Sequence, residues 1–187
     1  MTKRTNDTIP APGVDLQIGL LLAVLDQTTA TWRRQLDDVS DDVVVWQPFP
    51  GAPSIGLLIM HLVDAEAFWI KEVGDGRPLT PEELTAMLSK ETDQNSVQWP
   101  VPPRHPLSWY LAHHDAVRAQ TYEIASRIND PHHLGDRADL PDREFTLRWL
   151  LSHIIQHDAY HGGQAVMLSL MRDRLPLQTA YDDEAEE

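Results

Sequence analysis

The sequence predicts an all-α protein, a four-helix bundle with a long irregular connection between its second and third helices. Three observations support this class: apolar residues recur at helical spacing in four long stretches, proline and glycine separate these stretches, and no strand pattern competes seriously. The nearest candidate for a strand, "DDVVVWQ" at 41–47, is short. A chain of 187 residues suits one domain with a single core.

Each predicted helix is bounded by capping or turn-forming residues. The first covers 14–36, and the second begins after Ser54, an expected N-cap, and ends before Gly74. The third covers 107–128. The fourth covers 146–172 and is apolar nearly all the way round, which predicts that it is the most buried of the four.

The connections between these helices are predicted to be irregular. Prolines break 37–53, and the segment 129–144 links the third helix to the fourth. The long segment 77–106 contains one short helix, because Thr80 can cap it and Glu83 completes a capping box.

The sequence is expected to divide into a flexible leader at 1–13, a domain at 14–175 and an acidic tail at 176–187. The two basic residues of the leader precede no apolar run, so no signal peptide is expected, and no stretch reaches the ~18 to 20 apolar residues that cross a bilayer. A cytoplasmic protein is predicted, which agrees with the absence of cysteine.

The composition excludes several partners and ligands. A formal net charge of -14, from 29 acidic and 15 basic residues, opposes contact with nucleic acid or an anionic membrane, and no basic patch offsets it. Zero cysteines remove thiolate ligands, so nitrogen and oxygen must hold any metal. The expected partner is a small-molecule substrate.

Three histidines interrupt the apolar fourth helix in the stretch "WLLSHIIQHDAYHGGQAVML". His153, His157 and His161 are four residues apart, so neighbouring pairs lie on one helical face about 5–6 Å apart at Cβ. Eight residues rise about 12 Å, which is too far for all three to bind one ion. Either His153 with His157 or His157 with His161 can therefore form a pair.

A metal site in a bundle needs another ligand from a facing helix, and His61 is the histidine best placed to supply it. It lies on an apolar face of the second predicted helix, with Asp64 one turn later. The alternative is that the buried histidines are only hydrogen-bonded core residues, but three imidazoles in one stripe favour a metal. The remaining histidines have polar, loop or helix-end surroundings and are expected at the surface: His105, His113, His114, His132 and His133.

The pair "HDAYH" also invites comparison with the HExxH motif of zinc proteases. Here Asp158 replaces the glutamate, its side chain is shorter, and no signature of a third ligand follows. A protease is therefore not favoured.

The segments "SIGLLIMHLVDAEAFWI" and "HDAYHGGQAVML" resemble the DinB-like (DinB/YfiT) superfamily of metal-binding four-helix bundles, and the likeness covers most of the chain. The most specific element is a closing His-x-x-x-His-x-Gly-Gln pattern, which His157, His161, Gly163 and Gln164 match. Arginine is common before that glycine in the superfamily, and this sequence has Gly162 instead.

The resemblance implies a divalent metal, zinc or nickel, bound by His61, His157 and His161. His153 is then one turn outside the site, where a core position is favoured over a contact with substrate or with a ligand. Asp64 and Gln164 are the candidate catalytic residues, Asp64 to orient an imidazole or accept a proton and Gln164 to donate a hydrogen bond, although a surface carboxylate and a packing role are equally open.

Three neutral histidines leave an open coordination position, as catalytic zinc sites do. The resemblance implies a metal-dependent enzyme of the thiol transferase type, using mycothiol, bacillithiol or glutathione, or a related hydrolase. The alternative is a non-catalytic, stress-associated metal-binding protein. A fourth helix with little polar surface also predicts a homodimer, in which this helix contacts the partner.

Overall fold

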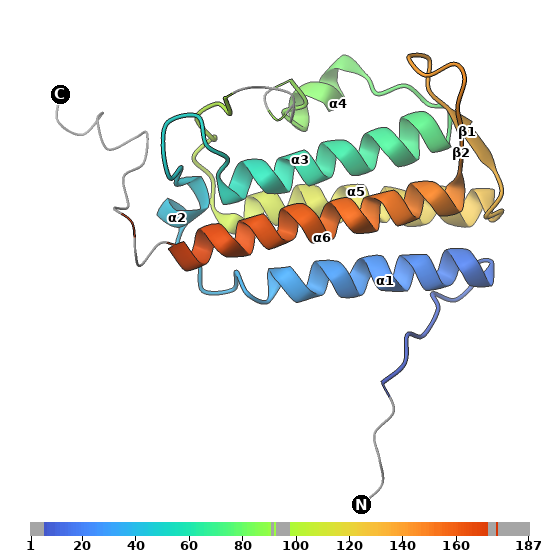
Figure 1. The fold of residues 1–187 in the computed structure, drawn as a ribbon, viewed down its shortest axis with the longest axis horizontal. Helices are drawn as coiled ribbons and strands as arrows, with labels where there is room; N and C mark the ends of the chain where they lie inside the picture. The colour runs from blue at the N-terminus through green and yellow to red at the C-terminus, as the bar shows by residue number, and fades with distance from the viewer. Residues whose placement is uncertain (1–5, 91, 93–97, 172–174, 176–187) are drawn as a thin grey trace, which may run out of the picture.

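The structure is a computed structural model that describes residues 6–90, 92, 98–171 and 175. The predicted all-α class is confirmed, because four long helices lie side by side and a single small hairpin is the only sheet among the described residues (Figure 1). Helix α6 contacts α1 and α3, and α3 contacts α5. The long helices are α1 (Leu16–Arg33), α3 (Ile55–Ala67) with its π-helical continuation η1 (Phe68–Gly74), α5 (Leu107–Ile128) and α6 (Leu147–Met171).

The ends of these helices follow the local signals in the sequence. The hydroxyl of Ser54 accepts a hydrogen bond from the amide of Leu57 at 3.2 Å and so caps α3. The capping box of Thr80 and Glu83 starts the short helix α4 (Pro81–Ala86), as predicted. Helix α5 ends at Asn129, whose φ of 47° is left-handed.

Two predicted connections contain regular structure. The segment 37–53 includes helix α2 (Asp41–Val45), whose first-turn acidic residues favour a helix N-terminus and whose valines are buried. The segment 129–144 and the two residues after it contain strands β1 (Leu134–Asp136) and β2 (Glu144–Thr146), which pair antiparallel. Strands of three residues are too short to show an alternating pattern in the sequence.

The prediction that the fourth helix is the most buried is wrong, because α3 is buried more completely. Eleven of the 13 residues of α3 are buried, whereas α6 keeps an exposed apolar face. The cause is position: α3 packs against both α5 and α6, while one face of α6 is left exposed by the described residues. The large apolar residues exposed on α6 are Trp149, Tyr160, Met167 and Leu170.

The described part of the core contains two large apolar clusters, which lie near opposite ends of the long helices. On α6, Leu147 to Ile154 belong to one cluster, and Ala165 and Leu168 belong to the other. The middle of the helix, around Asp158, carries polar side chains instead. The clusters follow in the same order along α1 and in the reverse order along α3 and α5, so a layer with polar side chains lies between them.

The tail predicted at 176–187 lies outside the described residues. Of the leader predicted at 1–13, residues 6–13 are described and form neither helix nor strand. The Ala11 amide donates a hydrogen bond to the carbonyl of Gly19 at 3.0 Å, which holds this part of the chain against α1. Within the described chain, no helix combines the length and hydropathy that crossing a membrane requires.

Gly162 allows α1 to approach α6 closely. A Cβ atom at this position would lie 2.3 Å from Cδ1 of Trp32, so any larger side chain would displace the indole. The indole of Trp32 therefore occupies the space that a side chain at position 162 would need. The neighbouring Gly163 is open, with nothing within 4 Å of an added Cβ.

We expect Gly162→Ala to lower the free energy of unfolding by about 1–3 kcal/mol, because the added methyl group overpacks the contact with Trp32. Gly163→Ala is the matched control and should raise it by up to about 1 kcal/mol, because alanine favours a helix over glycine. Urea unfolding followed by circular dichroism measures both. Equal effects of the two substitutions would contradict this account of the α1–α6 contact.

Candidate metal centre

Three histidines from α3 and α6 meet between these helices. The candidate ligand atoms of His61, His157 and His161 all lie within 4.8 Å of one another. The ring centroids of His61 are 4.9 Å from His157 and 4.6 Å from His161, and those of His157 and His161 are 4.6 Å apart. This is the set that the family resemblance predicts.

Burial keeps His157 and His161 in the neutral form, which is the form that binds a metal. His61 is 5% and His161 is 6% exposed. Burial, with the neighbouring His161 and His61, lowers the pKa of His157 to about 3, and burial also lowers the pKa of His161. The rings of His157 and His161 are therefore neutral at pH 7, with a lone pair on each for a ligand bond.

The residues around the cluster also fit a bound ion. The Nδ1 atom of His157 is buried and accepts no hydrogen bond from any described residue, so a buried acceptor is left for a ligand bond. Three nitrogen donors without a thiolate suit a divalent ion such as zinc or nickel. The described residues thus offer the donors that such a site requires.

Gln164 contacts one of the three histidines. Its Oε1 lies 2.7 Å from Nδ1 of His161. An amide oxygen only accepts, so Nδ1 of His161 carries the proton and donates it, and the lone pair is on Nε2. Gln164 therefore fixes the ring orientation and the tautomer that present Nε2 to an ion.

Asp64 is not a member of the three-residue cluster. Its carboxylate accepts a hydrogen bond from the hydroxyl of Ser89, which follows α4. This contact ties α3 to the segment that covers it (Figure 1). A catalytic role for Asp64 stays a prediction.

His153 lies between a metal-ligand candidate and two tryptophans. Its ring is nearly parallel to that of Trp149, at 5.0 Å and 6°, and 5.8 Å from that of His157. Trp69 meets it edge-on at 4.8 Å. His153 is half-buried, so the core position favoured from the sequence is not what the structure shows. It extends a row of rings away from the three-histidine cluster.

A buried charged network lies in the polar layer between the apolar clusters. Both carboxylate oxygens of Glu66 accept from Arg118, at 2.9 and 3.0 Å, and Thr121 donates to the same carboxylate at 2.6 Å. Asp158 accepts from the indole of Trp32 at 3.2 Å and from Thr29 at 3.0 Å. Burial raises the pKa of Asp158 to about 6, although Arg118 opposes this shift.

His114 belongs to this network, which corrects the prediction that it lies at the surface. It is 0% exposed, and its Nε2 lies 3.6 Å from Asp158 and 3.8 Å from Glu66. Its Nδ1 lies 2.7 Å from the guanidinium of Arg33. The helical spacing contained a signal, because His114 shares a stripe at intervals of three and four with buried residues of α5: Tyr110, Val117, Thr121 and Ile124.

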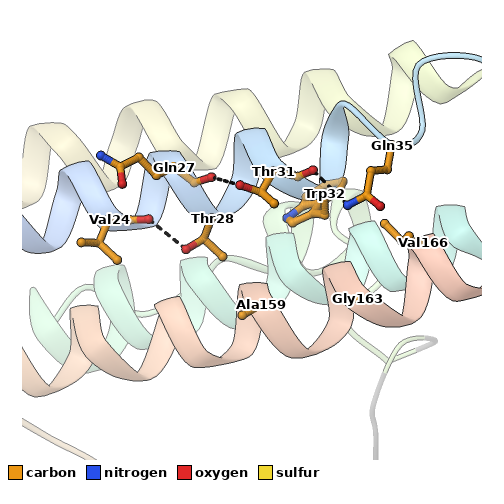
Figure 2. A pocket seen from close by; sticks show the side chains of 9 residues that line it. All are labelled: Val24, Gln27, Thr28, Thr31, Trp32, Gln35, Ala159, Gly163 and Val166. Carbon is orange, nitrogen blue, oxygen red and sulfur yellow. Dashed lines mark hydrogen bonds between the residues drawn. The ribbon is translucent and has the colours of Figure 1, made fainter. Parts of the chain in front are cut away.

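A pocket opens beside α6, and none of the three histidines lines it (Figure 2). It has a volume of about 400 Å³ between α1 and α6, and Gly163 and Trp32 contribute to its wall. The hydroxyls of Thr28 and Thr31 point along α1 and donate to its own carbonyls at 2.9 and 2.7 Å. The pocket is therefore separate from the candidate metal centre.

The helical fold and the three-histidine cluster between two of its helices define a protein of the DinB/YfiT-like class. The chain matches the Mycothiol-S-transferase family over residues 20–174 and belongs to that family. The resemblance inferred from the sequence motifs is thereby confirmed. No curated protein matches the chain.

The buried His114 predicts how stability depends on pH. Burial, with the charges of Arg118 and Arg33, lowers the pKa of His114 well below its usual value of 6.5. The unfolded chain binds a proton at this residue below pH ~6.5 and the folded chain does not, so acid favours unfolding. The free energy of unfolding should fall by up to about 1.4 kcal/mol for each pH unit below this value.

His114→Gln should remove this contribution while leaving the other histidines in place. Unfolding of both proteins, treated with a chelator, is measured about one pH unit above and below 6.5. The variant is expected to be less stable at both values but to show a shallower decrease on acidification. Parallel pH dependences in the two proteins would show that His114 is not buried in its neutral form.

Proposed function

We propose that this protein is a metal-dependent S-transferase that joins a low-molecular-weight thiol to an electrophile. The observation that carries the proposal is the cluster of His61, His157 and His161, with candidate ligand atoms within 4.8 Å of one another. These residues would hold a zinc or nickel ion. Membership of the Mycothiol-S-transferase family supports mycothiol as the thiol, with bacillithiol and glutathione as alternatives.

A divalent ion with an open coordination position lowers the pKa of a thiol that binds it and so supplies a thiolate. In the overall reaction a sulfur–carbon bond forms and the bond from that carbon to its leaving group breaks, with the electron pair going to the leaving group. The thiol proton is released, so the products are a thioether and the protonated leaving group.

The chain's own residues would orient the ligands and move the proton. Gln164 holds the ring of His161, through the 2.7 Å contact at Nδ1, so that Nε2 faces the other two histidines. Asp64 lies one turn after His61 and is hydrogen-bonded by Ser89, and we propose it as the acceptor of the thiol proton. A protein without cysteine has no thiol of its own to compete for the ion.

We further propose that α1, α3, α5 and α6 form the DinB-like four-helix bundle. The contacts of α6 with α1 and α3, and of α3 with α5, support this arrangement. The bundle would correspond to the domain predicted at 14–175, and a reducing cytoplasm would keep its thiol co-substrate reduced.

Two other functions use the same cluster. A related hydrolase would present water to the electrophile in place of the thiol, and a stress-associated binding protein would hold the ion without turnover. Both predict metal binding, so only an assay with a thiol separates them from the transferase.

We expect the purified wild-type protein to contain about one divalent ion per chain and, when loaded with zinc or nickel, to conjugate a thiol to iodoacetamide. His61→Ala removes one of three ligands and should lose the ion and lower the metal-dependent rate on the order of a hundredfold. Elemental analysis measures the ion, and release of iodide in the presence of mycothiol, bacillithiol or glutathione measures the rate.

The matched control is His132→Ala, because His132 is an exposed histidine outside the cluster. This variant should retain both the ion and the rate. Metal binding without conjugation of any thiol would favour the binding protein or the hydrolase, and a wild-type protein without stoichiometric metal would exclude all three functions.

We also propose a homodimer in which a second copy covers the exposed apolar face of α6. The exposed side chains of Tyr160, Met167 and Leu170 on one helix support this proposal. Light scattering should give about twice the chain mass of 21.2 kDa, and Leu170→Glu should shift the protein towards the monomer. A monomeric wild-type protein would exclude the dimer.

A further inference from the structure

The pocket between α1 and α6 is an uncharged groove on the surface of the molecule, and we call it the α1–α6 groove (Figure 2). Nine residues line its volume of about 400 Å³, and none of them has a charged side chain. One of them is Gly163, where nothing lies within 4 Å of an added Cβ, so the groove reaches the backbone of α6. A side chain from another molecule therefore has room to enter between the two helices.

Most polar side chains of the groove are already hydrogen-bonded within α1. The hydroxyls of Thr28 and Thr31 donate to carbonyls of α1 at 2.9 and 2.7 Å. The side-chain amide of Gln35 donates to the carbonyl of Thr31 at 3.3 Å. Three of the four polar side chains in the lining thus keep a hydrogen bond when they are covered. An apolar side chain can therefore fill the groove without leaving the two hydroxyl donors unpaired.

The groove is continuous with the exposed side of α6, because Ala159 and Gly163 belong to both. The exposed residues of α6 after Arg148 recur mostly at intervals of three, four or seven, which places them on one side of the helix. We call this side the α6 face, and its residues are Trp149, Gln156, Ala159, Tyr160, Gly163, Met167 and Leu170.

The α6 face has no acidic or basic side chain. From residue 149 to residue 171, all of which are described, the one acidic or basic residue is Asp158, and it is buried. Charged residues make up 24% of the whole chain, so this stretch is depleted of them. The centres of protein–protein interfaces have the same composition, with few charges and with tyrosine, tryptophan and methionine enriched.

The net charge of the chain indicates which partner this surface fits. Two copies, each with a formal net charge of -14, repel one another, so they can approach only through a surface without acidic side chains. The groove and the α6 face together form such a surface. A basic partner would instead be steered to the acidic side chains elsewhere on the chain. A second copy is therefore the occupant that the charges favour.

We propose that large side chains from the α6 face of a second copy fill the α1–α6 groove. The proposal rests on the proposed homodimer, and it states where the two copies interlock. Two-fold symmetry uses the same surface on both subunits, so that surface must be complementary to itself. Here one chain has both complementary parts, because Tyr160, Met167 and Leu170 project from the surface and the groove is recessed beside them.

A thiol introduced at Thr31 reports whether the groove is covered, because the chain has no cysteine of its own. In the dimer, Thr31→Cys should react with a maleimide at least about tenfold more slowly than when Leu170→Glu is added to make the protein monomeric. Ala30→Cys is the matched control, because Ala30 is an exposed neighbour on α1 that does not line the groove. Its rate should be the same in both backgrounds.

A charge placed in the groove tests the same contact without a label. Thr31→Glu would bury an unpaired carboxylate in the dimer, so the dissociation constant measured by sedimentation equilibrium should rise at least about a hundredfold. Ala30→Glu has the same net charge, and its dissociation constant should differ from that of the wild type by less than about threefold. Circular dichroism should show equal helix content in the two variants.

The possible results separate the groove from the dimer. A dimer in which Thr31→Cys reacts equally fast in both backgrounds, or in which the two glutamate variants associate equally well, would overturn the filling of the groove but not the homodimer. A monomeric wild-type protein would overturn both. These measurements need neither metal nor thiol, so they leave the S-transferase proposal to its own assay.

Discussion

The ion pair between Arg118 and Glu66 is the interaction on which the arrangement of the long helices depends. Buried charges are costly unless partners and hydrogen bonds compensate for the loss of water. The guanidinium of Arg118 on α5 binds both oxygens of Glu66 on α3 and lies 4.0 Å from Asp158 on α6. These contacts fix the rotation of the three helices about their axes relative to one another. Apolar clusters tolerate small shifts, but this polar layer does not.

The same layer sets the position of the candidate ligands. Asp158 is the residue after His157 on α6, and Glu66 lies little more than one turn after His61 on α3. Holding the two carboxylates around one guanidinium therefore also holds the two helices at the rotation that brings their histidines together. The network and the candidate metal centre use different faces of the same helices.

Much of the fold and the site could be predicted because the signals are local. Ser54 and the Thr80–Glu83 box mark helix starts within a few residues, and the four-residue spacing of His157 and His161 places them on one face. The buried network could not be predicted in this way, because Arg118 and Glu66 are 52 residues apart and only the packing of α3 on α5 joins them. The surroundings of His153 likewise could not be predicted, because they include Trp69 from η1.

The π-helix η1 has a consequence for how such a protein could diversify. Its geometry accommodates one residue more per turn than an α-helix, as a single-residue insertion into α3 would produce. Loss of one residue from Phe68–Gly74 would return the segment to α-helical geometry, and the residues on either side would keep their facing because the π-turn absorbs the extra residue locally. His61 precedes the insertion and would keep its place. Loss of one codon could therefore change which side chains this segment presents without moving the histidines.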